Sequence, residues 1–229
     1  MLIRTLTMVA GVALASPVLG QTLTVGGTGE VAFEPDLALV TLGVEADAPT
    51  PAEAVTAMGQ GLSPVLQSLT DAGIAPRDMQ TGTLNLRPVY ADQAETRPNE
   101  GPEIAGYRAE SLLSVRVRDL DTLGPVLDAA VTQGANRLEG IQWQLSDPQA
   151  AEDAALGAAV ADAVRKAAVM AQAAGLGLGE IEELREGEVG YEPPQPMMRM
   201  EASMADMPIA RGEVGVTANV TLRFATVAD

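Results

Sequence analysis

Methionine is the residue type in this chain whose local concentration could support chemistry. Five of its ten methionines fall within eleven residues, at Met197, Met198, Met200, Met204 and Met207. Thioether sulfur is a soft ligand that suits Cu(I), and a flexible segment could close several of these sulfurs round one ion. The same sulfurs can be oxidised to sulfoxide and then restored, which is the chemistry of an oxidant sink. A mobile lid or an oligomer contact built from adaptable apolar side chains is the favoured interpretation.

Two groups of charged residues could also form sites, and a structural explanation is favoured for each. The carboxylates of Asp147, Glu152 and Asp153 could bind a hard cation, but acids at this position also cap a helix and complement its positive end. Asp162 and Lys166 stand four residues apart, which predicts a surface ion pair rather than an acid–base pair.

Composition excludes the commoner kinds of catalytic site. The chain has no histidine and no cysteine, which removes Ser-His-Asp and Cys-His sites, imidazole-ligated metals and thiol chemistry. Tyr107 and Trp143 could line a pocket, but a lone aromatic side chain on an alternating strand usually belongs to the core. We therefore predict that the protein is not an enzyme, with no catalytic, cofactor-binding or metal-binding residue and no cofactor. The formal charge of −17 makes nucleic acid and anionic lipid poor partners.

The amino terminus has the organisation of a secretory signal. Arg4 precedes an apolar run over residues 6–15, and small residues follow before Gln21. The run is shorter than the roughly 20 residues that a membrane-spanning helix needs. We predict that residues 1–20 are removed on export. Residues 21–229 are then expected to form one domain, soluble in the periplasm and without a membrane span.

The best-defined element is an alanine-rich helix over residues 148–174. Asp147 is expected to cap its first turn, Pro148 fits the first helical position, and Gly175 supplies the left-handed residue that ends it. The packing face is predicted to comprise apolar residues at spacings of three and four, namely Leu156, Val160, Val164, Ala167, Ala171 and Ala174. Because half of this face is alanine, the helix backbone can lie close to a sheet.

Two further helices and a set of strands are predicted from local patterns. Thr50 and Glu53 form a capping box for a helix over residues 51–73. Pro64 is expected to kink or split that helix, and Asp121 to cap a shorter one that ends at Gly134. Periodicity predicts strands over residues 23–25, 37–47, 78–88, 104–118, 138–145, 180–188 and 213–224.

Three local expectations follow for the strands. Gly26–Gly29 should be a turn after an edge strand rather than a phosphate loop, because no helix opens after it. Leu84 and Leu86 are assigned to the buried side of their strand, which should form a hairpin with the next one. The last strand alternates without a fault and should lie centrally in a sheet.

These elements predict an α+β fold, with a largely antiparallel sheet and three helices packed on it, built as two loosely similar strand–helix–strand halves. Each helix ends at a glycine and leads into a strand within a few residues. The methionine- and proline-rich residues 190–211 are expected to form a flexible loop.

The order of several short motifs resembles that of the SIMPL-domain family of bacterial envelope proteins. Although each motif is short, together they span nearly the whole mature chain. They are Gly27-Thr28-Gly29, Pro35-Asp36, Gly73-Ile74, Asp78-Met79-Gln80-Thr81, Gly106-Tyr107-Arg108-Ala109, Gly134-Ala135-Asn136, Gly140-Ile141, Asp147-Pro148, Asp162-Ala163, Lys166-Ala167, Pro208-Ile209 and Gly212-Glu213.

The resemblance implies an exported α+β protein that is prone to self-association and is linked to oxidative-stress defence, with no catalytic residue to carry over. It also favours the lid or contact interpretation of the methionine segment, because such loops vary within a family. We therefore expect a non-enzymatic, homo-oligomeric envelope protein that contributes to stress tolerance. The alternative is a Cu(I)-binding or oxidant-scavenging protein that acts through the loop Met197–Met207.

Overall fold

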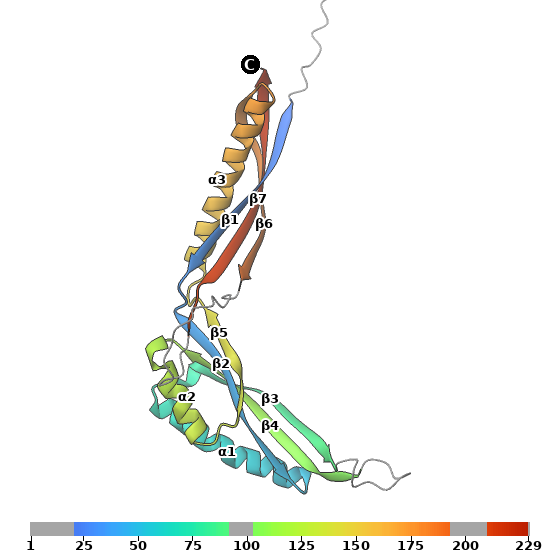
Figure 1. Cartoon of the computed structure of the whole chain (residues 1–229), viewed down its shortest axis with the longest axis vertical. Coiled ribbons are helices and arrows are strands. Elements are labelled where there is room, and N and C mark those ends of the chain that lie inside the picture. The colour runs from blue at the N-terminus through green and yellow to red at the C-terminus, as the bar shows by residue number, and fades with distance from the viewer. Residues whose placement is uncertain (1–20, 92–102, 193–209, 229) are drawn as a thin grey trace, which may run out of the picture.

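The computed structural model describes residues 21–91, 103–192 and 210–228. Within these residues lie three α-helices and seven strands, and the strands form two antiparallel sheets. The predicted α+β class is confirmed, with the strands divided between two sheets. Figure 1 shows an elongated molecule in which the two sheets lie end to end, each with its own helices.

One sheet has three strands and is covered by one long helix. Its order is β1 (Thr22–Phe33), β7 (Val214–Ala228) and β6 (Leu176–Glu192), and α3 (Gln149–Ala173) packs on one face. The alternating strand β7 is central, as its pattern predicts. Strand β6 extends through Glu192, so the first residues of the predicted irregular segment belong to the sheet.

The other sheet has four strands and two helices. Its order is β3 (Met79–Tyr90), β4 (Ile104–Val117), β2 (Leu37–Ala48) and β5 (Arg137–Gln144). The helices α1 (Pro51–Asp71) and α2 (Leu123–Thr132) pack with its buried face, and short 3-10 turns, η1 (Pro76–Asp78) and η2 (Leu120–Thr122), precede β3 and α2. The predicted hairpin of β3 and β4 is confirmed. Tyr107 and Trp143 pack against this core, as the alternation of their strands predicts.

The packing face of α3 differs from the predicted one. The residues that are buried recur at every fourth position and are all alanine: Ala151, Ala155, Ala159, Ala163, Ala167 and Ala171. Leu156 and Val160 lie at the margin of this face, while Val164 and Ala174 are exposed. The small residues are inside because the helix lies too close to the sheet to admit larger ones.

Glycines of β1 make that close approach possible. The turn predicted at Gly26–Gly29 is wrong, because these residues lie inside one continuous strand. A Cβ placed on Gly27 would lie 2.1 Å from the carbonyl oxygen of Ala159, and one on Gly29 would lie 2.1 Å from that of Ala155. No side chain fits between strand and helix at either position. The absence of a Cβ, rather than a left-handed backbone, is what these two glycines contribute.

Several predicted side-chain positions are corrected by the structure. Leu84 and Leu86 were assigned to a buried side, yet both are exposed, because α1 and α2 do not cover this part of the hairpin. Val55 on α1 and Val131 on α2 are exposed as well. Their helices bury a narrower face than the apolar pattern suggests.

The helix ends follow the sequence signals with small shifts. Thr50 Oγ1 accepts a hydrogen bond from the amide of Glu53, which confirms the capping box, and α1 continues through Pro64 without a break. Asp121 does not cap α2; instead the carboxylate of Asp119 accepts from the amide of Asp121 in η2. Asp147 accepts from the amide of Gln149 at 3.2 Å, as expected of a residue that satisfies the first turn, but α3 begins at Gln149 and Pro148 is its N-cap residue rather than its first helical residue.

Side chains also tie together the segments that connect the two sheets. Asp36, between β1 and β2, accepts hydrogen bonds from the amide and hydroxyl of Ser146, between β5 and α3, at 2.6 and 2.5 Å. Arg211, just before β7, pairs with Asp121 at 2.5 Å. The hydrogen bonds from Ser146 hold the pKa of Asp36 below its ordinary value, so its carboxylate stays charged.

Candidate functional site

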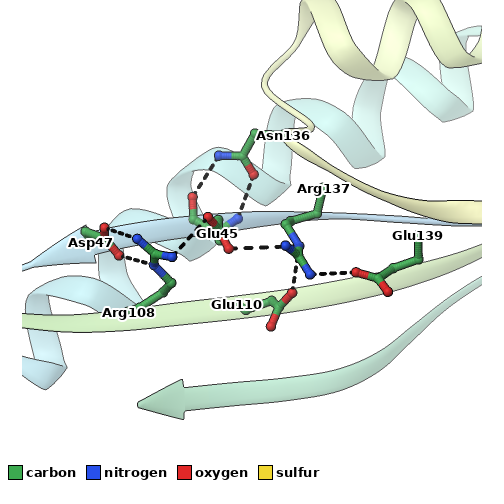
Figure 2. A network of polar contacts seen from close by, with 7 residues as sticks. All are labelled: Glu45, Asp47, Arg108, Glu110, Asn136, Arg137 and Glu139. Carbon is green, nitrogen blue, oxygen red and sulfur yellow. Dashed lines mark hydrogen bonds and ion pairs between the residues drawn. The ribbon is translucent and has the colours of Figure 1, made fainter. Parts of the chain in front are cut away.

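A cluster of polar side chains lies on the face of the four-stranded sheet that α1 and α2 leave open. Along β2, Val44 is buried in the core, so its neighbour Glu45 points to the opposite face. The strand register places Glu110 beside Glu45, and Arg108 beside Asp47. Figure 2 shows these residues with the partners that β5 and the segment before it contribute: Asn136, Arg137 and Glu139.

Two arginines join the carboxylates of this cluster. Arg108 donates from Nε and Nη2 to the two carboxylate oxygens of Asp47, at 2.6 and 2.7 Å. Arg137 lies 3.0 Å from Glu110 and donates to Glu139 at 2.7 Å. Both guanidinium groups also approach Glu45, at 3.6 and 3.9 Å (Figure 2). The cluster therefore links β2, β4 and β5 across the sheet.

Asn136 attaches the start of β5 to β2 through its amide side chain. Its Nδ2 donates to the carbonyl oxygen of Glu45 at 2.9 Å, and its Oδ1 accepts from the amide of Glu45 at 2.8 Å. The amide side chain thus replaces the hydrogen bonds of a paired strand residue. This geometry explains an asparagine in the Gly134-Ala135-Asn136 motif, because no apolar residue could satisfy both backbone groups.

The electrostatics of the cluster favour permanently charged groups. The hydrogen bonds from Arg108 lower the pKa of Asp47, and those to Asp47 raise the pKa of Arg108. Glu110 raises the pKa of Arg137 by its charge. A general acid at neutral pH needs a carboxyl whose pKa is raised, and the shift at Asp47 runs the other way. These ion pairs hold neighbouring strands together.

A second cluster joins α3 to the edge strand β1. Asp162 Oδ2 accepts from the backbone amide of Thr28 at 3.1 Å and lies 2.6 Å from Lys166 Nζ, while Oδ1 lies 2.6 Å from Arg165. Lys166 Nζ also donates to the carbonyl oxygen of Gly26 at 3.4 Å. The predicted pair of Asp162 and Lys166 is confirmed, but it contacts the backbone of another element. Hydrogen bonds from Lys166, Thr28 and Arg165, in that order, lower the pKa of Asp162 strongly.

An ion pair with one buried member holds the start of β3 in place. Asp78, only 6% exposed, accepts from Nε and Nη2 of Arg118 at 3.1 and 2.8 Å. These hydrogen bonds lower the pKa of Asp78 and raise that of Arg118. The pair ties η1 to the end of β4, and it shows that the Asp78 motif serves structure.

A small apolar hollow of about 270 Å³ lies between α2 and the start of β5. Leu42 and Leu127 are buried at it, while Val131 and Leu138 are exposed. Its volume is below the roughly 300–1,000 Å³ of typical ligand sites. The polar side chains that line it, Asn136 and Arg137, are already engaged in the cluster on β2, β4 and β5.

The acidic residues considered in the sequence do not converge on one point. Asp147 accepts from the amide of Gln149 at the start of α3, whereas Glu152 accepts a hydrogen bond from the hydroxyl of Tyr191, whose pKa that bond raises to about 12. Within residues 21–91, 103–192 and 210–228, no three acidic side chains are grouped to hold a metal ion. The five loop methionines, Met197 to Met207, lie outside the described residues.

Sequence reasoning did not find the cluster of Figure 2 or the contact from Asp162 to Thr28. The alternation of Glu45 and Asp47 on one strand and of Arg108 and Glu110 on another was a usable signal, because opposite charges on paired strands attract. Using it required the register of β2 against β4. The contact from Asp162 had a weaker signal, an acid beside the alanine face of a helix.

Known proteins resemble this chain over most of its length. The family model SIMPL, described as a protein of unknown function (DUF541), matches residues 23–224. The 26 kDa periplasmic immunogenic protein of Brucella melitensis is 36% identical over 211 residues, which cover 88% of this chain and 83% of that protein.

More distant relatives carry the name uncharacterized protein YggE. The protein of Edwardsiella ictaluri is 29% identical over 86% of this chain and 80% of its own length. That of Escherichia coli K12 is 29% identical over 79% of this chain and 71% of its own length. The motif residues Thr28, Asp36, Asp78 and Asp162 make the structural contacts described above, so these four residues hold elements of the fold together. The chain belongs to the SIMPL family.

Proposed function

We propose that this chain is an exported periplasmic protein that acts without catalysis, by associating with further copies of itself, and that it contributes to tolerance of oxidative stress. In this proposal residues 1–20 are the secretory signal and residues 21–229 form one functional domain. The relative from Brucella melitensis is named as periplasmic, which supports the location. No helix in the described part of the chain is long and apolar enough to cross a bilayer.

The observation that carries self-association is a set of four exposed apolar residues on the hairpin of β3 and β4. Its members are between 44% and 62% exposed: Leu84, Leu86, Tyr90 and Ile104. Tyr90 and Ile104 are paired across the hairpin. Strand β3 lies at the edge of its sheet, so among the described residues no strand pairs with its outer backbone groups, which could accept a further strand. Clustered exposed apolar side chains mark an interaction surface more often than scattered ones do.

The polar residues support the non-catalytic part of the proposal. Asp36, Asp47, Asp78 and Asp162 each have a lowered pKa, in each case because hydrogen bonds stabilise the charged form. Such carboxylates do not exchange protons near neutral pH. Each of them instead joins two elements of the fold.

Analytical ultracentrifugation of the mature chain tests the proposal. We expect an assembly of several copies that is independent of metal and dissociates when Leu84→Glu and Leu86→Glu are combined. Leu184→Glu is the matched control, because Leu184 is equally exposed, at 55%, on the edge strand of the other sheet. A monomeric wild-type chain, or equal dissociation in the control, would contradict self-association through the hairpin.

The stress-tolerance part has its own test in the native host. Cells that lack the gene should survive peroxide less well, and the wild-type gene should restore survival. The combined variant Leu84→Glu and Leu86→Glu should restore it poorly, whereas Leu184→Glu should restore it fully. Full restoration by the combined variant would separate stress tolerance from assembly.

The alternative function is soft-metal binding or oxidant scavenging through Met197–Met207. The observation that favours it is the grouping of five methionines within eleven residues, because thioether sulfur can bind Cu(I) or be oxidised reversibly. Titration of the mature chain with Cu(I) should then show stoichiometric binding that is lost when all five methionines are replaced by leucine. Binding that survives this replacement would exclude the loop as the copper ligand. Reduced survival of the leucine variant under oxidant, without Cu(I) binding, would favour the sink.

A further inference from the structure

The edge strand β1 has backbone groups that its sheet does not use. Its neighbour is β7, and the register pairs Thr28 with Asn219. The amide of Thr28 and the carbonyl of Gly26 point away from β7, because residues two apart on a strand direct their backbone groups to the same side. Unpaired groups of this kind are a template for the strand of another molecule.

In this structure two side chains of α3 occupy those groups. Asp162 accepts from the amide of Thr28 at 3.1 Å, and Lys166 donates to the carbonyl of Gly26 at 3.4 Å. The two side chains also pair with each other at 2.6 Å. An acceptor and a donor thus take the positions that the carbonyl and the amide of an added strand would take.

The reach of these side chains depends on how closely α3 lies to β1. An aspartate side chain is short, so the helix backbone must approach the strand for its carboxylate to pass the edge. Gly27 and Gly29 permit this approach, since a Cβ at either position would lie 2.1 Å from a helix carbonyl. The alternating glycines and the ion pair are therefore parts of one arrangement.

We propose that Asp162 and Lys166 lock the edge of β1 and prevent an edge strand of a second copy of the chain from extending the three-stranded sheet there. The opposite edge is protected differently. Its strand, β6, has three irregularities in its register with β7. It also carries glutamates along its length, at Glu180, Glu182, Glu183, Glu186, Glu188 and Glu192. Bulges and charges are common protections of an edge strand, so both edges of this sheet resist pairing.

The contact of Asp162 and Lys166 with the edge of β1 persists in acid. The same hydrogen bonds that close the edge keep Asp162 ionised to well below its ordinary pKa of 3.8. The groups that face it are Lys166 and Arg165 on its own helix and the amide of Thr28 on β1. Mild acidification therefore leaves the edge closed.

Hydrogen exchange provides the direct test of the contact. In the mature chain carrying Asp162→Ala and Lys166→Ala, kept at a concentration too low for larger species to form, we expect the amide of Thr28 to exchange at least about tenfold faster than in wild type, because it loses a charged acceptor. The amide of Gly27, which points toward β7, should keep its rate. The milder variant Asp162→Asn, which preserves the size of the side chain, should give a smaller increase at Thr28. Unchanged exchange at Thr28 would overturn the proposal.

The size distribution of the same variants tests the consequence. The double variant should form larger species than wild type, whatever the size of the wild-type assembly, as measured by sedimentation velocity. Adding Thr28→Pro should reverse this growth, because proline removes the outward amide that an added strand needs. The control Asp47→Ala with Arg108→Ala removes an ion pair of the same net charge from a sheet face and should leave the size unchanged. If faster exchange at Thr28 brings no growth, or if Thr28→Pro fails to reverse it, the lock does not govern strand addition.

Discussion

Gly27→Ala is the change for which the structure gives the clearest expectation. The new Cβ would lie 2.1 Å from the carbonyl oxygen of Ala159 and 2.7 Å from the amide nitrogen of Ala163, both of which are backbone atoms. A flexible side chain could move aside, but helix backbone cannot do so alone. The substitution must therefore push α3 away from β1.

The magnitude follows from that displacement. Relieving the overlap requires a movement of about 1 Å, and a gap of this size forfeits roughly a quarter to a half of each dispersion contact that it opens. Overpacking of a well-packed core costs about 1–3 kcal/mol and occasionally more. We expect about 3 kcal/mol, because α3 buries a whole face of alanines on this sheet. For a chain of this size that lowers the melting temperature by roughly 6–12 °C.

The matched control is Gly26→Ala, one residue away on the other face of the same strand. The nearest atom to its Cβ is 4.0 Å away, so the change should be within about 1 kcal/mol, and favourable if the strand gains from a lower unfolded-state entropy. Thermal unfolding followed by far-UV circular dichroism measures both variants. Equal melting temperatures would refute the close approach of α3 to β1 and the packing argument built on it.

The remaining predictions concern the packing face of α3, the ion pair of Asp78 and the methionines. Ala163→Asp should destabilise by more than about 3 kcal/mol, because it buries an unpaired carboxylate, whereas Val164→Asp on the exposed side should cost under about 1 kcal/mol, as urea denaturation will show. Asp78 has a lowered pKa, so its contribution to the stability of the fold is complete above its ordinary pKa of 3.8 and is lost as pH falls through the lower pKa of the folded state. Asp78→Asn should therefore be less stable than wild type near neutral pH. Melting curves from about pH 2 to 7 should show a smaller loss of stability in acid for the variant than for wild type. Under limited peroxide, peptide mapping should find sulfoxide at Met197, Met198, Met200, Met204 and Met207 before Met58, which is 5% exposed. Met170 lies on α3 but is 48% exposed, so it should be oxidised early as well. Loop methionines that react no faster than Met58 would contradict the predicted exposure of residues 190–211.

Local signals in the sequence were sufficient for much of the fold. The capping box at Thr50 and the contact of Asp147 with Gln149 are short-range hydrogen bonds between residues two or three apart, so a linear reading finds them. The alternation of β7 shows which of its faces is buried, and its lack of a polar interruption marks it as central. The absence of histidine and cysteine likewise needs no structure to exclude imidazole and thiol chemistry.

The tertiary structure alone decided which apolar residues are buried and which charges meet. Periodicity assigns burial by size and would place Val164 inside, but the glycines of β1 bring α3 so close that only its alanines fit. Leu84 and Leu86 alternate like core residues, yet burial needs a covering element, and the helices end their contact before reaching them. The clusters around Arg108 and Asp162 depend on strand register and helix placement, which join residues more than sixty positions apart. Such contacts arise from packing of whole elements, and no local pattern in the sequence specifies that packing.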